Sequence, residues 1–187
     1  MRKQKGFSLI ELLIVVAIIL IIAAIAIPNL LRAKISANES SAVGSVRNIV
    51  TGEVSYQASF PQYGFAVSLV NLGPNGGAGC PAGPDPTLGA CLLDANLAGA
   101  AISNKSGYRF VATGDNPVPN PNAPPANTLT GFTITAYPAN YNQTGVRAFC
   151  AGDDGVLRQH PNTGNVITAT QDPWTANCVA APWVILQ

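Results

Sequence analysis

The chain has 187 residues, enough for one domain with a buried core, and a formal net charge of +1. Only 10% of its residues are charged, and they form no basic patch interleaved with aromatic residues, so nucleic acid is not expected as an obligatory partner. The mean composition hides two unlike parts, an apolar stretch near the N-terminus and a polar remainder rich in Gly, Pro, Asn and Thr.

The apolar stretch is residues 12–31, which are 20 consecutive residues without a charge, nearly all of them Leu, Ile, Val or Ala. A helix of that length covers about 30 Å, the thickness of a bilayer core. Arg2, Lys3 and Lys5 precede it, and cations on that side favour a cytoplasmic N-terminus. The sequence therefore predicts one membrane-spanning helix, with the remainder of the chain on the exported side.

Glu11 stands at the beginning of this stretch, and it separates three interpretations. Neither a plain membrane anchor nor a cleaved secretory signal, with Ala24-Ile25-Ala26 as the cleavage site, accounts for an acid at this place. A carboxylate costs roughly 2.5–3.5 kcal/mol at the centre of a bilayer and less near its edge. It needs a cationic partner, and the third interpretation supplies one.

The third interpretation rests on a family resemblance. After a short basic leader, Gly6-Phe7-Ser8-Leu9-Ile10-Glu11 closely resembles the class III signal of type IV prepilins. The resemblance continues through Leu12-Leu13-Ile14-Val15-Val16 and on to Ile27-Pro28-Asn29-Leu30-Leu31. It combines a cleavage site, an acid and a proline at fixed spacing, which makes the match specific.

The resemblance implies roles for four positions. In that family a membrane peptidase cuts after the glycine and methylates the new first residue, which implies a leader of residues 1–6, cleavage after Gly6 and N-methylation of Phe7. The glutamate that corresponds to Glu11 pairs with the amine of a neighbouring subunit's first residue during assembly. Pro28 removes the helical bond to the Ala24 carbonyl and is expected to kink the helix. In pilins the segment that leads to this proline, here residues 23–28, can lose helicity in the filament; a static bend is the alternative.

Helical patterning continues beyond the membrane segment. Apolar residues recur at intervals of three and four and form one face of an amphipathic helix: Ile35, Ala42, Val43, Val46, Ile49, Val50 and Val54. Charged residues fall largely between them: Arg32, Lys34, Glu39, Arg47 and Glu53. Phe60-Pro61 ends the pattern, because the residue before a proline avoids the helical region.

A continuous helix over residues 7–60 would be about 80 Å long, too long for a globule of this size to bury. Residues 7–31 must therefore lie in lipid or pack against copies of the same chain, whereas residues 32–60 form the amphipathic second half.

The sequence of residues 61–187 predicts a small α+β head, in which an antiparallel sheet packs on the long helix. Residues 61–106 form a connection rich in Gly and Pro, from which Leu69, Val70 and Leu72 are expected to fold back onto the helix. Residues 107–187 contain the sheet and a C-terminal loop. Four strands are expected, at residues 107–113, 131–137, 146–151 and 156–160, with residues 116–127 as an exposed loop. This arrangement again resembles pilins.

Four cysteines, Cys80, Cys91, Cys150 and Cys178, all lie on the exported side and predict two disulfides. Three pairings are possible, and the low cost of closing short loops favours Cys80 with Cys91 and Cys150 with Cys178. A zinc site is the alternative, but no pair has C-x-x-C spacing and His160 is the single histidine. In the pilin resemblance, residues 150–178 correspond to the disulfide-closed variable region of the head.

No catalytic, cofactor or metal site is expected. His160 with Asp153 or Asp154 could be drawn as part of a catalytic triad, but Asp153-Asp154-Gly155 reads more simply as a hairpin turn. Calcium at this turn is a second alternative, because the related major pseudopilins of type II secretion bind calcium in a loop of the head. Calcium needs six to eight oxygen ligands, and two adjacent acids supply few of them.

The sequence thus predicts a type IVa-like pilin precursor, a structural subunit of a helical filament and not an enzyme. Its expected partners are copies of itself, the prepilin peptidase and the pilus assembly platform. The expected location is the inner membrane before assembly and the extracellular pilus afterwards, where the fibre would serve adhesion, motility or DNA uptake. Two alternatives remain, a type II secretion pseudopilin and a membrane-tethered monomeric binding module.

Overall fold

The computed structural model describes residues 8–74, 80, 83–121, 127–161, 178 and 183–186. The chain forms two compact units, Met1–Lys34 and Ile35–Gln187. Helix α1, Leu9–Ser59, contributes its first half to the first unit and its second half to the other. Its bounds agree with the predicted helix within two residues at the N-terminal side and one at the C-terminal side.

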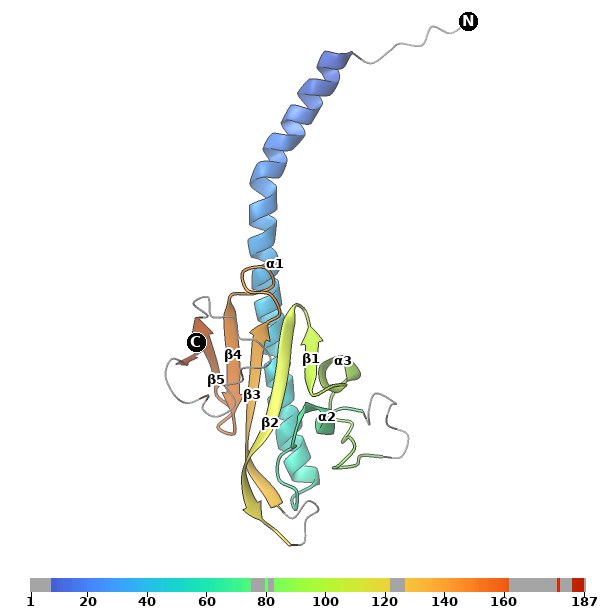
Figure 1. Ribbon diagram of the computed structural model, residues 1–187, viewed down its shortest axis with the longest axis vertical. Coiled ribbons are helices and arrows are strands. Elements are labelled where there is room, and N and C mark those ends of the chain that lie inside the picture. Colours follow the sequence, from blue (N-terminus) through green and yellow to red (C-terminus); the bar gives the residue numbers. More distant parts are fainter. Residues whose placement is uncertain are drawn as a thin grey trace, which may run out of the picture. The chain divides into compact units, whose positions relative to one another are not determined.

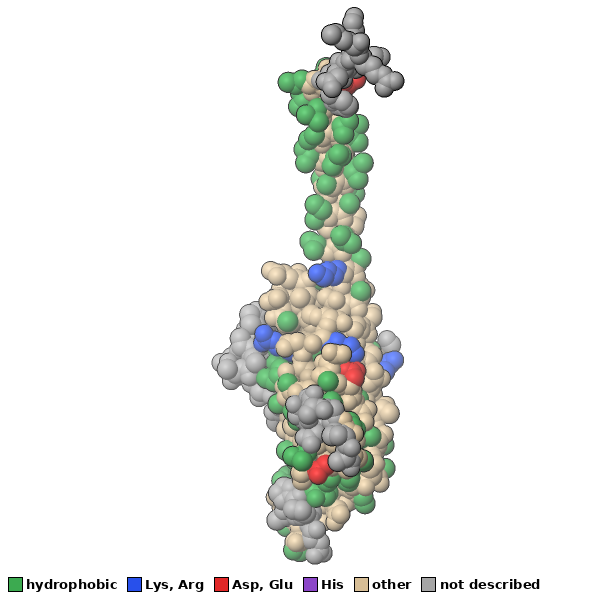
Figure 2. All heavy atoms as spheres, turned by 90° about the vertical axis from the view of Figure 1, so that its right-hand side faces the viewer, with side chains coloured by type: hydrophobic (Ala, Val, Ile, Leu, Met, Phe, Trp, Pro, Cys, Tyr) green, Lys and Arg blue, Asp and Glu red, His purple; other side chains and the backbone are tan. Residues whose placement is uncertain are grey.

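The first unit is a helix whose apolar side chains are uncovered. From Leu9, which is 76% exposed, to Leu31, at 52%, no large apolar side chain is buried. Figure 2 shows hydrophobic side chains along the visible face of this segment. By length and composition, α1 is able to cross a membrane. A helix that is apolar on all sides is stable only when lipid or other protein covers it.

The second unit contains an antiparallel sheet of six strands in the order β1-β2-β3-β4-β5-β6. Their bounds are Ile102–Lys105, Tyr108–Pro119, Asn127–Pro138, Arg147–Gly152, Leu157–Pro161 and Val184–Ile185. Each strand pairs with the next along the chain, so local hairpins build the sheet from β1 to β5. β6, which is distant in sequence, pairs with β5. Figure 1 shows β1 to β5 side by side across the second half of α1.

The core lies between the sheet and the second half of α1. Alternate residues of the central strands point at the helix, as the period of two in a strand requires. The largest fully buried side chains of the core come from α1, the sheet and the short helices α2, Leu69–Leu72, and α3, Ala95–Ala98: Tyr56, Tyr108, Phe110, Phe149, Ile49, Leu69, Leu72, Leu97 and Ile134. Leu69 and Leu72 therefore fold back onto the core, as predicted.

Two disulfides close the loops of this unit. Cys80 is bonded to Cys91 in the connection between α2 and α3, and Cys150 of β4 is bonded to Cys178. These are the pairings that short-loop closure favours. Together with the long apolar helix and the antiparallel sheet, they confirm the predicted α+β class.

The extent of the sheet was predicted incompletely. β1 and β6 were missed, and residues 116–119 and 127, assigned to an exposed loop, belong to β2 and β3. Pro117 and Pro119 pair with Leu129 and Asn127 in a ribbon at the end of the sheet, where Gly64 bridges to the other edge of β3. Among the described residues, β1 pairs with β2 only as far as Val111, so the outer edge of β2 is free at these prolines and a residue without an N–H is tolerated there.

The predicted faces of α1 were also wrong in part. Val54 is 54% exposed, whereas Glu39 and Glu53, assigned to the polar side, are buried. Six of the buried positions of α1 follow a spacing of three and four residues: Glu39, Ala42, Val46, Ile49, Glu53 and Tyr56. The two acids thus lie within the core-facing stripe, and each must be satisfied there or remain uncharged.

Candidate assembly site

Glu11 lies in the first turn of α1, among the exposed apolar side chains of the first unit. Its carboxylate oxygen Oε2 accepts a hydrogen bond from the backbone N–H of Ser8 at 3.0 Å. This contact satisfies one of the free N–H groups at the helix N-terminus, where a negative charge is also favoured by the helix dipole. The bond holds the carboxylate at the very start of the helix.

The charge of Glu11 has no cation beside it in the part of the chain that the structure describes. The two ion pairs found there join Arg147 to Glu39 and Arg158 to Asp154, all in the second unit. A carboxylate that enters a lipid or protein environment without a cation costs several kcal/mol. Chemically, this arrangement can accept a cation from another chain while the surrounding apolar surface packs against that chain.

The two residues of the expected cleavage site, Gly6 and Phe7, lie outside the described residues. Pro28 lies inside α1, which is helical on both sides of it. The predicted kink at Pro28 stays a prediction. So does the loss of helicity over residues 23–28, which concerns the subunit within a filament.

In the second unit, Glu39 of α1 binds the beginning of β4. Its Oε1 accepts the backbone N–H groups of Val146 and Arg147, each at 3.0 Å. Its Oε2 lies 2.8 Å from Nε and 2.7 Å from Nη2 of Arg147. Burial by itself would raise the pKa of Glu39, but the two backbone N–H groups and the guanidinium outweigh burial and hold that pKa below its usual value. Glu39 is therefore a charged anchor between the helix and the sheet.

Glu53 is the opposite case. It is fully buried, its Oε2 accepts the N–H of Ala66 at 2.9 Å, and its Oε1 has no hydrogen-bond partner among the described residues. Burial raises the pKa of Glu53 to about 8, although the bond from Ala66 opposes that rise. Near neutral pH the protonated form dominates, so this acid sits in the core mainly as a neutral group.

At the turn formed by Asp153, Asp154 and Gly155, which was considered as a catalytic or calcium site, the Asp154 carboxylate bonds to residues of the same hairpin. Asp154 Oδ2 lies 2.5 Å from Arg158 Nη2, and Asp154 Oδ1 accepts the N–H of Val156 at 2.9 Å. His160 is buried in β5, where its ring lies 5.4 Å from that of Trp183. Among the described residues, no three His, Cys, Asp or Glu side chains gather in a way that could hold a metal ion.

Sequence reasoning singled out Glu11 and Pro28, whose roles stay predictions, and it missed the roles of Glu39 and Glu53 in the core. The signal was present in the spacing, because residues 39, 42, 46, 49, 53 and 56 fall on one helical face. The prediction placed Glu39 and Glu53 on the polar side of the helix because they are acids, although their spacing places them on the buried face.

Comparison with known proteins bears on the N-terminal segment in particular. Residues 1–27 match the family model of the prokaryotic N-terminal methylation motif. The chain is 45% identical over 74 residues, 39% of its length, to the type IV wide pilus major component PilA4 of Thermus thermophilus, of which 56% is covered. It is 31% identical over 125 residues, 63% of its length, to the type IV major pilin protein PilA of Myxococcus xanthus, of which 57% is covered. The chain thus spans little more than half the length of these curated relatives. No solved structure matches it significantly.

Proposed function

We propose that this chain, a type IV pilin by its N-terminal methylation motif and its similarity to named pilins, is a structural subunit that polymerises into a helical surface filament. The first unit would form the filament core and the second unit its surface. The relatives are named as pilus components, so a structural role is favoured over an enzymatic one.

The observation that carries this proposal is the combination found in residues 9–31. These residues expose large apolar side chains on every side. Glu11, the one acid among them, stands near their beginning and has no cation beside it among the residues that the structure describes. In a filament, copies of the helix would cover one another, and burial of their apolar surface would supply most of the cohesion. Head-to-tail contacts that do not close on themselves give an open helical polymer.

Processing supplies the missing cation in this account. Cleavage after Gly6 by a prepilin peptidase would expose the amine of Phe7, which would be methylated and would carry a positive charge. The amine of one subunit would then pair with Glu11 of its neighbour. Within an apolar core, the attraction of the two charges offsets the cost of their desolvation only when the geometry of the pair is good. Before assembly, the same helix would hold the subunit in the inner membrane, from which an assembly platform would extract it.

The type II secretion pseudopilin is not favoured, because both named relatives are pilus components. The membrane-tethered binding module differs from a filament subunit in one testable respect, since a tether has no need of an acid at position 11. Adhesion, motility and DNA uptake would be activities of the assembled fibre rather than of individual side chains.

The test is Glu11→Ala in the full-length chain, expressed in cells that lack the natural copy. We expect the variant to accumulate in the membrane, because alanine is easier to insert than glutamate, and to be absent from filaments sheared off the cell surface. Asp153→Ala is the matched control, since it removes an exposed acid in the second unit. Normal amounts of sheared filament from Glu11→Ala cells would contradict the pairing.

A further inference from the structure

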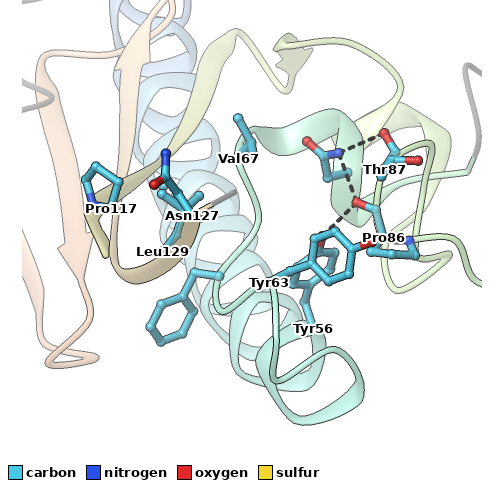
Figure 3. Close-up of a pocket in the computed structure, with 11 residues that line it drawn as sticks. Tyr56, Tyr63, Val67, Pro86, Thr87, Pro117, Asn127 and Leu129 are labelled. Carbon is cyan, nitrogen blue, oxygen red and sulfur yellow. Dashed lines mark hydrogen bonds between the residues drawn. The ribbon is translucent and has the colours of Figure 1, made fainter. Parts of the chain in front are cut away.

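A cavity of about 370 Å³ lies in the second unit, and none of its lining residues belongs to the proposed assembly site. Its size falls within the range of small-ligand pockets, and its lining is mostly apolar, as is usual for such pockets. The lining residues come from five separate stretches of the chain: Tyr56, Tyr63, Phe65, Val67, Asn71, Pro86, Thr87, Gly114, Pro117, Asn127 and Leu129. In Figure 3, Tyr56, Tyr63 and Pro86 lie on one side, and Pro117, Asn127 and Leu129 face them from the other.

Hydrogen bonds fix the side formed by Tyr56 and Pro86. The Tyr56 hydroxyl donates to the Pro86 carbonyl at 2.7 Å. The amide nitrogen of Asn71 donates to the carbonyls of Pro86 and Thr87 at 3.2 and 3.1 Å. Asp85 accepts the N–H groups of Thr87 and Leu88 and the Thr87 hydroxyl, which holds this turn in shape. This wall therefore needs no rearrangement to receive a ligand.

The contacts that join Tyr63 to Leu129, which lie on the two sides of the pocket, are also fixed. The backbone of residues 63–65 pairs with Leu129, through Leu129 N–H to the Tyr63 carbonyl at 2.9 Å and Phe65 N–H to the Leu129 carbonyl at 3.0 Å. The Phe65 ring packs on Phe132 with centroids 4.8 Å apart, and the Tyr63 ring packs edge-on against Phe60 at 6.4 Å. The aromatic rings thus have set orientations before anything binds.

Two polar groups of the lining remain available. Neither the Tyr63 hydroxyl nor the Asn127 side-chain amide makes a hydrogen bond to another residue that the structure describes, whereas the hydrogen-bonding groups of Tyr56 and Asn71 are engaged. Tyr63 and Asn127 both line the pocket, from opposite sides (Figure 3). Each can donate and accept a hydrogen bond.

The charge and polarity of the lining restrict the ligand. Among the described residues, no charged side chain lines the pocket, so an ionic ligand would be buried there without a partner at high cost. A wholly apolar ligand would take water from Tyr63 and Asn127 without replacing their hydrogen bonds, which is also unfavourable. The ligand that fits both conditions is neutral, with one apolar face and hydroxyl groups at its edge.

We propose that this pocket binds a neutral pyranose sugar unit, whose C–H face packs on the aromatic rings while its hydroxyls bond to Tyr63 and Asn127. The faces of aromatic rings carry partial negative charge and attract the weakly positive C–H groups of a sugar. The Tyr63 hydroxyl and the Asn127 amide select the orientation of the ring, and the prolines close the sides. This inference stands independently of filament assembly, because it rests on the second unit alone.

The test is an NMR titration of the full-length chain in non-ionic detergent, with the methyl groups of leucine and valine labelled. The probes are the methyl pyranosides of glucose, galactose and mannose, and that of N-acetylglucosamine, each at millimolar concentration. Micelles without protein serve as the blank. We expect at least one of these glycosides to shift the methyl signals of Leu129 and Val67 in a saturable manner, and those of Leu20 to stay unchanged.

Two variants then test the polar contacts. Tyr63→Phe keeps the ring and removes only the hydroxyl, and Asn127→Ala removes the amide. Loss of one hydrogen bond is expected to weaken binding about tenfold in each variant. The matched controls are Tyr141→Phe and Asn140→Ala, which change the same residue types outside the pocket and should bind like the parent chain.

Three results would overturn the proposal. The first is that none of the four glycosides shifts the pocket methyl signals. The second is equal binding by the parent chain and by Tyr63→Phe and Asn127→Ala. The third is binding of cyclohexanol, added as an apolar probe of similar ring size, under conditions in which no glycoside binds.

Discussion

Glu39 and Glu53 lie on the same buried face of α1, yet their carboxylates have opposite pKa shifts. Glu39 meets the Arg147 guanidinium and two backbone N–H groups, whereas Glu53 meets a single N–H, that of Ala66. The same residue type on one helix is therefore held as an anion at one position and as a neutral acid at the other. Two predictions on stability follow from this difference.

Removal of the Glu39 carboxylate should loosen the attachment of β4 to α1. We predict that Glu39→Ala lowers the free energy of unfolding by about 3 kcal/mol, because it leaves the N–H groups of Val146 and Arg147 without an acceptor. Thermal unfolding of the full-length chain in non-ionic detergent measures the change. Asp153→Ala, at an exposed acid, should leave the stability within about 0.5 kcal/mol. If Glu39→Ala and Asp153→Ala change the free energy of unfolding equally, the contacts of Glu39 with β4 contribute nothing to stability.

The buried acid at position 53 should make stability depend on pH. Its pKa is raised to about 8 in the folded chain from an ordinary value of 4.5, so the folded state binds more protons between these values. Unfolding free energy should therefore fall as pH rises from about 4.5 to about 8, on the order of 1 kcal/mol per pH unit, and level off above that range.

Glu53→Gln tests this prediction, because glutamine keeps an acceptor for the Ala66 N–H and cannot ionise. The variant should lose the decline in stability between about pH 4.5 and pH 8, and it should be more stable than the parent chain near pH 9 by roughly several kcal/mol. Melting temperatures measured across the pH range in detergent give the comparison. A parent chain and a variant with parallel pH profiles would refute the assignment of Glu53 as a neutral acid.

The two disulfides should differ in their contributions to stability. The loop between Cys80 and Cys91 spans a sequence separation of 11, and that between Cys150 and Cys178 spans 28. Because closing a longer loop restricts the unfolded chain more, replacing Cys150 and Cys178 together with serine should cost about 3.5 kcal/mol, against about 3 kcal/mol for the other pair. Thermal unfolding of the two double variants tests the order, and a smaller loss for the longer loop would contradict it.

Gly64 should tolerate no side chain. Its φ of +77° is in the region that L-residues rarely adopt, and an added Cβ would collide with the backbone carbonyl of Leu129. We predict that Gly64→Ala destabilises the second unit by about 3 kcal/mol or more. Gly155→Ala is the control, since Gly155 has a φ of +67° but open space around it, so that only backbone strain of about 1 kcal/mol remains. A thermal unfolding assay that ranks the two equally would exclude the predicted clash.

The parts of the fold with strong local signals could be predicted from the sequence. The uncharged residues 12–31 fixed the position of α1, and alternating residues located the centres of β2, β3, β4 and β5. β1 has four residues and β6 has two, which is too short for periodicity to show. The prolines at 117 and 119 concealed the ribbon, because their backbone is acceptable only where a strand edge is free.

The candidate functional sites also differ in how far the sequence alone could reveal them. Glu11 could be singled out from the sequence as a candidate site, because an acid at the start of an apolar helix is unusual. The pocket proposed to bind a sugar could not be found in this way. Tyr63 and Asn127 are far apart in the sequence, and they line one pocket because Leu129 pairs with residues 63–65. The cation for Glu11 would come from another copy of the chain, so neither the sequence nor the fold of one copy displays the completed pair.

The central claim is that the chain is cleaved after Gly6 and exported into a filament. Intact mass and N-terminal sequencing of material sheared from the cell surface test this most directly. The account predicts a chain that begins with N-methylated Phe7, whose mass is lower by four hydrogens because both disulfides are closed. A chain that still begins with Met1 and stays in the membrane fraction would contradict the account and favour a tethered monomer.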